Sequence, residues 1–114
     1  MKRIAIVACE NSNTVCAGCA CLNAFYDRRK SFERYAGEEL RLMAFMRCSH
    51  CVKDGDPMQD AGFVEKLERF VCESVEIVHI GLCGGRTEET ACPGMAKMAA
   101  AFREKGLTVV WGTH

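Results

Sequence analysis

Apolar and polar positions alternate in blocks that predict four β-strands separated by three helices. Strands buried on both faces of a parallel sheet appear as continuous apolar runs, and helices appear as apolar residues three and four positions apart. Continuous apolar runs occupy residues 2–9, 39–47, 75–82 and 107–111. Helices are predicted from residue 22 into the charged run 27–30, from 57 to about 73, and from 93 to 105.

The second and third helices have the clearest sequence signals. Asp56-Pro57 favours a helix start, because aspartate caps a helix N-terminus and proline suits the first helical position. Cys92-Pro93 opens the third helix, and Lys105-Gly106 is a strong stop. The predicted buried stripe of the second helix is Met58, Ala61, Val64, Leu67 and Val71. The predicted buried stripe of the third is Met95, Met98, Ala99 and Phe102.

This β-α-β-α-β-α-β order predicts an α/β fold in one three-layer domain over residues 1–114. Crossovers between parallel strands are right-handed, and we expect a four-stranded parallel sheet with the Rossmann- or flavodoxin-like order 2-1-3-4. No helix is predicted after the fourth strand, so the first helix covers one sheet face largely alone. The apolar surface left on that face predicts a homodimer.

Cysteine or histidine follows every predicted strand. Cys9, the pair Cys48 and Cys51, Cys83 and His114 all lie at or just after a strand end. The carboxyl ends of parallel strands meet at one edge of the sheet, which is where doubly wound folds bind ligands. The remaining cysteines expected on this side are Cys16, Cys19, Cys21 and Cys92. The sequence therefore predicts a thiol-rich site at the carboxyl edge.

Composition narrows the classes of function. The net charge is zero at pH 7 and no basic block occurs, so the chain lacks the electrostatic signature of a nucleic-acid or anionic-membrane binder. No apolar run approaches the roughly 20 residues that a membrane helix needs. The first apolar run stops at Cys9-Glu10 without a signal-peptide cleavage site, so we expect a cytoplasmic protein. In the reducing cytoplasm, nine cysteines favour metal binding or redox chemistry over a disulfide framework.

The Cys48-Ser49-His50-Cys51 motif is compatible with several kinds of site. Its spacing lets both sulfurs bind one tetrahedral zinc ion with two further ligands, and it also fits part of an iron–sulfur site. It fits a redox dithiol less well, because residues 52–57 separate it from the next helix. Two inert buried thiols are the remaining explanation. His50 is either a further ligand or a solvated loop residue.

The other cysteines and histidines are either candidates for the site or structural residues. Cys92 is expected at a helix N-cap, where the helix dipole favours a thiolate, so it is a candidate nucleophile or ligand. Cys21 is either part of the site or a small apolar residue of the first helix. Cys72 lies late in the second helix and is expected to be structural. His79, inside the third strand, is typical of a hydrogen-bonded core residue, and His114 either folds over the site or is a disordered end.

Several common motifs are absent from the sequence. No cysteine at a predicted strand end has the arginine six residues later that a Cys-x5-Arg phosphatase or arsenate-reductase loop requires. The residues at that position are Val15, Asp54 and Glu89. No Gly-x-Gly-x-x-Gly or Walker sequence occurs, and Gly84-Gly85 is only a weak signal for an anion site.

Taken together, these features resemble the CGGC-domain family of small proteins found mainly in bacteria and archaea. The resemblance covers almost the whole chain. Its landmarks are Cys9, the Cys16/Cys19/Cys21 segment followed by residues 32–35, Cys48/Cys51, His79, Cys83, Cys92-Pro93 and residues 112–114. The central Cys-Gly-Gly-Cys of the family is Cys48-Ser49-His50-Cys51 here, so the thiols remain and the glycines do not. The resemblance implies metal binding, with zinc expected, and implies no biochemical role.

Three hypotheses follow from the sequence. The first is a metal-binding domain centred on Cys48 and Cys51, with zinc preferred and an iron–sulfur cluster second. The pool for the remaining ligands is Cys9, Cys83, Cys92, Cys16, Cys19 and His114. The second is a thiol-dependent redox or transfer enzyme that uses Cys48 and Cys51, or Cys92. The third is a binding domain without a cofactor.

Overall fold

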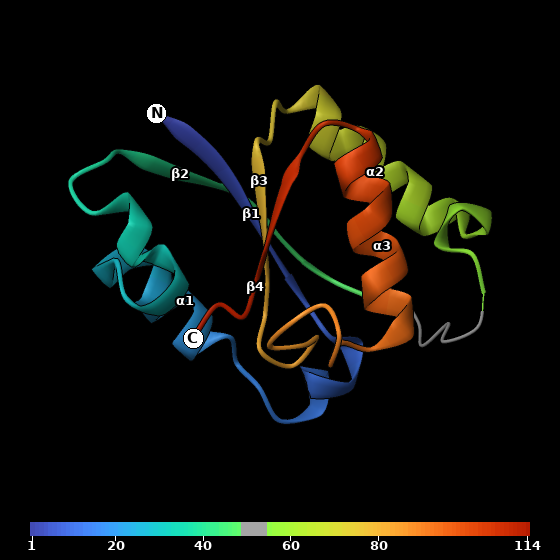
Figure 1. The fold of residues 1–114 in the computed structure, drawn as a ribbon, viewed down its shortest axis with the longest axis horizontal. Coiled ribbons are helices and arrows are strands. Elements are labelled where there is room, and N and C mark those ends of the chain that lie inside the picture. Colours follow the sequence, from blue (N-terminus) through green and yellow to red (C-terminus); the bar gives the residue numbers. More distant parts are fainter. Residues whose placement is uncertain (49–54) are drawn as a thin grey trace.

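A computed structural model describes residues 1–48 and 55–114 (Figure 1). The strands in these residues are β1 (Lys2–Ala8), β2 (Leu40–Arg47), β3 (Ile77–Ile80) and β4 (Thr108–Trp111). The α-helices there are α1 (Cys19–Asp27), α2 (Ala61–Cys72) and α3 (Pro93–Glu104). Short 3-10 helices in the connections are η1 (Glu10–Thr14), η2 (Lys30–Tyr35) and η3 (Pro57–Gln59).

The strands of the described residues form one parallel sheet in the order β2-β1-β3-β4. This confirms both the predicted α/β class and the predicted strand order. Neighbouring strands end nearly level, since Ala8 of β1 pairs with Arg47 of β2, and Ile80 of β3 pairs with Trp111 of β4. The carboxyl ends of all these strands therefore share one edge of the sheet.

The sheet separates two layers of buried side chains. Along β1, Ala5 and Val7 pack in the cluster that α2 and α3 complete, whereas Ile4 and Ile6 pack in the cluster of α1 and η2. This alternation is the two-residue period of a strand, and all four side chains are fully buried. Figure 1 shows α2 and α3 on one side of the sheet and α1 on the other.

Aromatic packing dominates the layer of α2 and α3. The ring of Phe102 stacks on Phe70 at a centroid distance of 5.5 Å and meets Phe63 edge-on at 5.6 Å. All three rings are buried. Truncating a phenylalanine in such a core to alanine costs about 3–5 kcal/mol, so this cluster is a main source of stability for the fold.

The predicted buried stripe of the second helix is wrong at most positions. Met58 and Val71 are 40% and 46% exposed, and the buried residues of α2 are instead Phe63, Leu67 and Phe70. Only Leu67 belongs to both sets. The observed stripe keeps helical spacing but is displaced by one residue at both ends. The physical reason is size, because two phenylalanine rings bury more apolar area than two valines.

The start of the second helix also differs from the prediction. Asp56 does accept a hydrogen bond from the Met58 N–H, with Pro57 in the first position, but the turn that they start is the short η3. The carboxylate of Asp60 then accepts from the Gly62 N–H and starts α2 at Ala61. A second capping aspartate therefore breaks the predicted helix into two pieces.

The third helix matches its prediction. It begins at Pro93 with Cys92 at the N-cap position, and its buried side chains include Met95, Met98, Ala99 and Phe102. Near the amino terminus, α1 begins at Cys19, earlier than the predicted residue 22. Gly18 precedes it with φ +84°, a left-handed conformation that glycine adopts without strain. β3 is shorter than predicted, at Ile77–Ile80.

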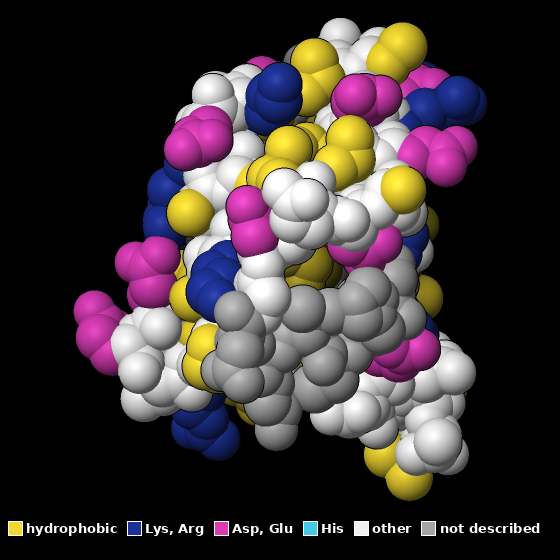
Figure 2. All heavy atoms as spheres, turned by 90° about the vertical axis from the view of Figure 1, so that its right-hand side faces the viewer, with side chains coloured by type: hydrophobic (Ala, Val, Ile, Leu, Met, Phe, Trp, Pro, Cys, Tyr) yellow, Lys and Arg dark blue, Asp and Glu magenta, His cyan; other side chains and the backbone are white. Residues whose placement is uncertain are grey.

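The surface around α2 and α3 carries charges of both signs. Figure 2 shows basic and acidic side chains interspersed over this face, with hydrophobic side chains gathered in its upper part.

Within the described parts of the chain, no helix combines the length and the apolar character needed to span a membrane.

Candidate functional site

Four cysteines form a row along the carboxyl edge of the sheet. The N–H of Cys48, just after β2, donates to the carbonyl of Ala8 at 3.0 Å. The N–H of Cys9, just after β1, donates to the sulfur of Cys83 at 3.1 Å. Beyond β3, the N–H of Cys92 donates to the carbonyl of Gly84 at 3.2 Å. These consecutive bonds join the backbone around Cys48, Cys9, Cys83 and Cys92, which we call the cysteine row.

A tight turn directs the sulfur of Cys83 back over the sheet edge. The Gly81 N–H continues the sheet by donating to the Val7 carbonyl at 2.7 Å, and the Gly84 N–H then closes a turn onto the Gly81 carbonyl at 2.8 Å. A Cβ added at Gly81 would lie 3.3 Å from the Cys83 sulfur. The absence of a side chain at Gly81 thus leaves room for that sulfur beside β1.

Gly84 and Gly85 are explained by packing. A Cβ at Gly84 would lie 2.8 Å from the Ile80 side chain, and one at Gly85 would lie 2.7 Å from Ala91. Gly85 also has φ +149°, which other residues rarely adopt. The Gly84-Gly85 pair therefore brings the loop close to β3 and Ala91, which accounts for both glycines without an anion.

Arg47, the last residue of β2, anchors the loop that carries Cys16. Its guanidinium donates to the Ser12 hydroxyl at 3.0 Å and to the Cys16 carbonyl at 3.2 Å. Ser12 in turn donates to the Cys9 carbonyl at 2.7 Å. The sulfur of Cys16 accepts from the Gly18 N–H at 3.3 Å. One cation therefore ties the ends of β1 and β2 to the segment leading into α1.

Cys21, on α1, is buried beneath the end of the chain. Its sulfur lies 3.1 Å from the Thr113 hydroxyl and 3.8 Å from His114 Nδ1. Burial raises the pKa of the Cys21 thiol, the Thr113 hydrogen bond opposes this shift, and nearby Cys83 and Cys16 add to it. Cys21 is thus a neutral, hydrogen-bonded thiol close to Cys83 and Cys16.

His79 is the fully buried polar centre of the α1 layer. Its ring stacks on Phe32 at 4.1 Å, its Nε2 lies 2.8 Å from the Tyr35 hydroxyl, and its Nδ1 lies 3.1 Å from the Ser31 hydroxyl. Burial, with a smaller contribution from Arg34, lowers the pKa of His79 to about 3. This is the hydrogen-bonded core histidine that its place inside a strand predicts.

The His79 network extends to the carboxyl edge. The Ser31 hydroxyl donates to the Thr113 carbonyl at 3.3 Å, and the Thr113 hydroxyl lies 3.0 Å from His114 Nδ1. A neutral His79 with its proton on Nδ1 fits every contact: Tyr35 donates to Nε2, and Nδ1–H donates to Ser31. The buried histidine thus fixes the segment that covers Cys21.

The predicted site residues differ in their surroundings. Cys48 and Cys92 are half-buried against the core of α2 and α3. Cys9 is half-buried as well. The exposed candidates are Cys16, Cys19 and Cys83. Cys51 and His50 lie outside the described residues.

No metal-binding group is preformed in residues 1–48 and 55–114. Within these residues, no three side chains from His, Cys, Asp and Glu are grouped closely enough to hold a metal ion. Cys72, which is expected to be structural, ends α2 and is exposed on the surface. It lines a surface hollow with other α2 residues.

The sequence did not indicate Arg47, Ser31 or Thr113 as site residues. Arg47 ends a strand, which was a usable signal, because the residues at strand ends face the predicted site. Ser31 and Thr113 had no signal of their own. Their contacts with His79 and Cys21 join residues that are 48 and 92 positions apart in the sequence.

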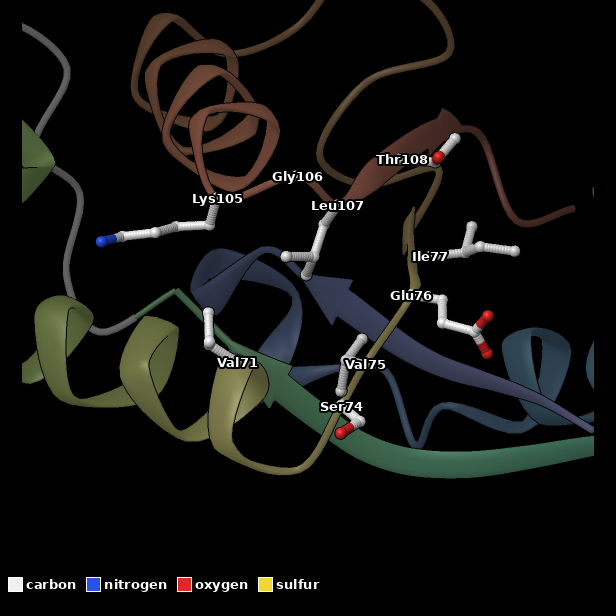
Figure 3. A pocket seen from close by; sticks show the side chains of 9 residues that line it. All are labelled: Val71, Ser74, Val75, Glu76, Ile77, Lys105, Gly106, Leu107 and Thr108. Atoms are coloured by element: carbon white, nitrogen blue, oxygen red, sulfur yellow. The ribbon is translucent and has the colours of Figure 1, made fainter.

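The hollow drawn in Figure 3 is at the opposite edge of the sheet. It has a volume of about 570 Å³ and lies where β3 and β4 begin, lined by residues that include Val75, Leu107 and Thr108. In Figure 3, the charged ends of Glu76 and Lys105 point away from each other. No cysteine or histidine lines it. It is therefore separate from the thiol-rich edge.

A family model decides the relationship of this chain to known proteins. The model described as "CGGC domain" matches residues 3–114. The chain belongs to the CGGC-domain family. No curated protein and no solved structure matches the chain. In this CGGC domain, Cys48 directly follows β2.

Proposed function

We propose that this CGGC domain binds a metal ion at the carboxyl edge of the sheet, with zinc preferred and an iron–sulfur cluster second. The observation that carries the proposal is the cysteine row, Cys48, Cys9, Cys83 and Cys92. Four thiolates are the ligand set of many structural zinc sites and of common iron–sulfur clusters. Cys51 remains a ligand predicted from the sequence.

Two further observations fit a metal-bound thiolate. The sulfur of Cys83 already accepts a backbone N–H from Cys9. The indole N–H of Trp111, at the end of β4, is buried without a hydrogen-bond partner among the described residues. Trp111 packs against the same core as Cys48 and Cys92. Buried donors normally have partners, and a metal-bound sulfur is one kind of acceptor for such a donor.

The proposal requires the cysteine side chains to rotate when metal binds, because no such group is preformed. A cysteine has one side-chain torsion, and a change between its staggered wells moves the sulfur by roughly 3 Å. Half-buried or exposed thiols at the end of strands have room for this movement. Bound metal would join the loops after β1, β2 and β3 into one unit.

The α1 side of the edge supports a metal less well. Cys21 is buried, and burial raises the pKa of its thiol, which opposes the thiolate that a metal needs. Cys16, Cys19 and His114 remain as additional ligands in the proposal, since the first two are exposed and His114 lies beside Cys21.

The proposal includes a cytoplasmic location and a homodimer. A reducing compartment keeps unpaired thiols available for metal. The β4 edge of the sheet has no further strand beyond it in the described residues, and among these residues α1 is the α-helix that covers its side of the sheet (Figure 1). A second copy is expected to cover part of the α1 side. Light scattering of the purified protein should give twice the chain mass of 12.6 kDa; the mass of a single chain would contradict the dimer.

Anaerobic purification with elemental analysis and a visible absorption spectrum tests the metal proposal. We expect zinc at a stoichiometric level and no visible colour. A brown protein with iron and sulfide would place a cluster at the edge instead. A metal-free protein that gains no metal on anaerobic reconstitution would overturn the proposal, and fast-reacting thiols in that protein would favour a thiol enzyme.

A further inference from the structure

We infer that Cys9 and Cys83 are a redox-active dithiol, which exchanges electrons with a low-molecular-weight disulfide and closes into a Cys9–Cys83 disulfide bond. This inference is separate from the proposed metal site, because it concerns the metal-free, reduced protein. The motif that the sequence singled out for thiol chemistry was Cys48-x-x-Cys51. The structure points to two cysteines 74 positions apart.

The two residues meet because β1 and β3 are hydrogen-bonded neighbours. Val7 pairs with Ile80, so Cys9 lies two residues and Cys83 three residues beyond a paired position. Neighbouring strands lie about 4.8 Å apart, and disulfides span about 4.4–6.8 Å between Cα atoms. The Cys83 sulfur lies 3.1 Å from the Cys9 nitrogen. Rotation of the two side chains is the remaining movement that a bond requires.

The exposure of the two cysteines assigns their order in the reaction. Cys83 is exposed, so its thiolate is the group that attacks one sulfur of the small disulfide. That step forms a mixed disulfide on Cys83 and releases one small thiol. The half-buried Cys9 then attacks the Cys83 sulfur and releases the second small thiol. Two protein thiols lose two electrons and two protons, and the small disulfide gains them as two thiols.

The neighbouring thiols are less suited to be the partner of Cys83. Cys21 is close to Cys83, but it is 4% exposed and its sulfur is hydrogen-bonded to Thr113. Cys16 accepts a hydrogen bond from Gly18 within its own loop. Cys9 is half-buried, no residue in the described parts of the chain holds its sulfur in a hydrogen bond, and its backbone N–H already contacts the Cys83 sulfur.

Peptide mapping after oxidation tests the assignment. The whole protein is reduced, freed of metal by chelation, and treated with oxidised glutathione, after which remaining thiols are alkylated. Trypsin together with a glutamate-specific protease cleaves after Arg3, Glu10, Glu76 and Arg86. Cys9 then lies alone in peptide 4–10 and Cys83 alone in peptide 77–86. We expect these two peptides to be the main disulfide-linked pair.

Variants separate the two steps. In Cys9→Ser, we expect Cys83 to remain as a mixed disulfide with glutathione, because the second thiol is missing. Cys72→Ser, an exposed cysteine on α2, is the matched control and should keep the Cys9–Cys83 link. Circular dichroism shows whether each variant is folded. If Cys9→Ser is unfolded, peptide mapping of the wild-type protein still shows whether Cys9 and Cys83 form a disulfide bond.

Three outcomes would overturn the inference. They are a disulfide link from Cys83 to any cysteine other than Cys9, a mixed disulfide on Cys83 that persists in the wild-type protein, and an absence of any oxidation at Cys83. None of them bears on zinc content, so failure here is distinguishable from failure of the proposed metal site.

Discussion

The two ends of the sheet use their polar groups differently. At the amino end, charges are paired: Arg3 lies 4.0 Å from the Glu73 carboxylate, its N–H donates to Glu76, and Lys2 pairs with Glu38. At the carboxyl end, the cation of Arg47 is bonded to a hydroxyl and a carbonyl, and the Cys83 sulfur accepts a backbone N–H. Ion pairs join the charges at the amino end, whereas at the carboxyl end hydrogen bonds join a cation and a thiol to hydroxyl and backbone groups.

The largest expected effect is a loss of bound zinc when cysteines at the carboxyl end of the sheet are replaced. Cys9→Ser combined with Cys48→Ser removes half of the cysteine row, so we expect zinc to fall from about one per chain to background, since a tetrahedral site cannot form with two ligands missing. Elemental analysis of anaerobically purified protein measures this. Cys48→Ser combined with Cys51→Ser should have the same effect.

A matched change elsewhere should leave the metal in place. Glu73→Gln alters the amino end, and Cys72→Ser removes an exposed thiol of α2. We expect full zinc in both variants. Unchanged zinc in the Cys9/Cys48 variant, or loss of zinc in Cys72→Ser, would contradict the assignment of the site to the cysteine row.

The free energy of unfolding should depend on pH because His79 titrates differently in the folded and unfolded states. Its pKa is about 3 in the folded protein and about 6.5 when unfolded, so between these values the unfolded state binds more protons. The stabilising effect of neutral His79 is complete above about pH 6.5 and is lost as the pH falls toward 3. The unfolding free energy should fall by about 1.4 kcal/mol per pH unit in this window. Denaturant titrations at pH 7, 6 and 5 measure it.

Two variants identify the group responsible for this slope. His79→Gln keeps a polar side chain in the Tyr35–Ser31 site but does not titrate, so its stability should be flatter between pH 7 and 5. His114→Gln keeps His79 and should keep the wild-type slope. A His79→Gln protein with the wild-type slope would show that other groups produce the effect.

Thr113→Val should have a smaller, local effect. It removes the hydroxyl that bonds the Cys21 sulfur at 3.1 Å, and that bond holds the pKa of Cys21 below the value that burial alone would set. We expect slower alkylation of Cys21 near pH 8 and a stability loss of about 1 kcal/mol. Thr108→Val, at the start of β4 with an exposed side chain, is the control and should change neither quantity. Faster alkylation of Cys21 would contradict the hydrogen-bond assignment.

The amino-end ion pair should contribute least. Arg3 and Glu73 have side chains 29% and 42% exposed, so solvent and salt screen their attraction. Glu73→Gln should reduce stability by less than about 1 kcal/mol, and 1 M salt should remove the difference. Urea denaturation with and without salt measures it. A larger, salt-independent loss would show that this end is not simply a screened charge cluster.

Particular residues show what could be predicted from the pattern alone. Cys9 and Cys83 were assigned to one edge because each follows an apolar run, and parallel strands bring their carboxyl ends together. The second helix shows the opposite case. Its predicted stripe missed Phe63 and Phe70, because spacing alone does not determine which of two adjacent helical faces packs against Phe102.

The hydrogen-bonded chain from Tyr35 to His114 was beyond sequence reasoning. His79 was recognisable as a core residue, but its partners Tyr35 and Ser31 are 44 and 48 positions away and lie on a 3-10 helix that the pattern did not indicate. Thr113 appeared only as part of a chain end. Its contacts depend on how α1 packs against β3 and β4.

The sequence by itself determined the α/β class, the strand order and the gathering of thiols at one edge, because apolar periodicity and the handedness of crossovers are local rules. Only the tertiary structure decided which thiols meet. The Cys9–Cys83 contact arises from strand register and the turn at Gly81, and burial of Cys21 under Thr113 arises from packing of the chain end on α1. Contacts between side chains depend on distances across the fold, and no local pattern encodes those distances.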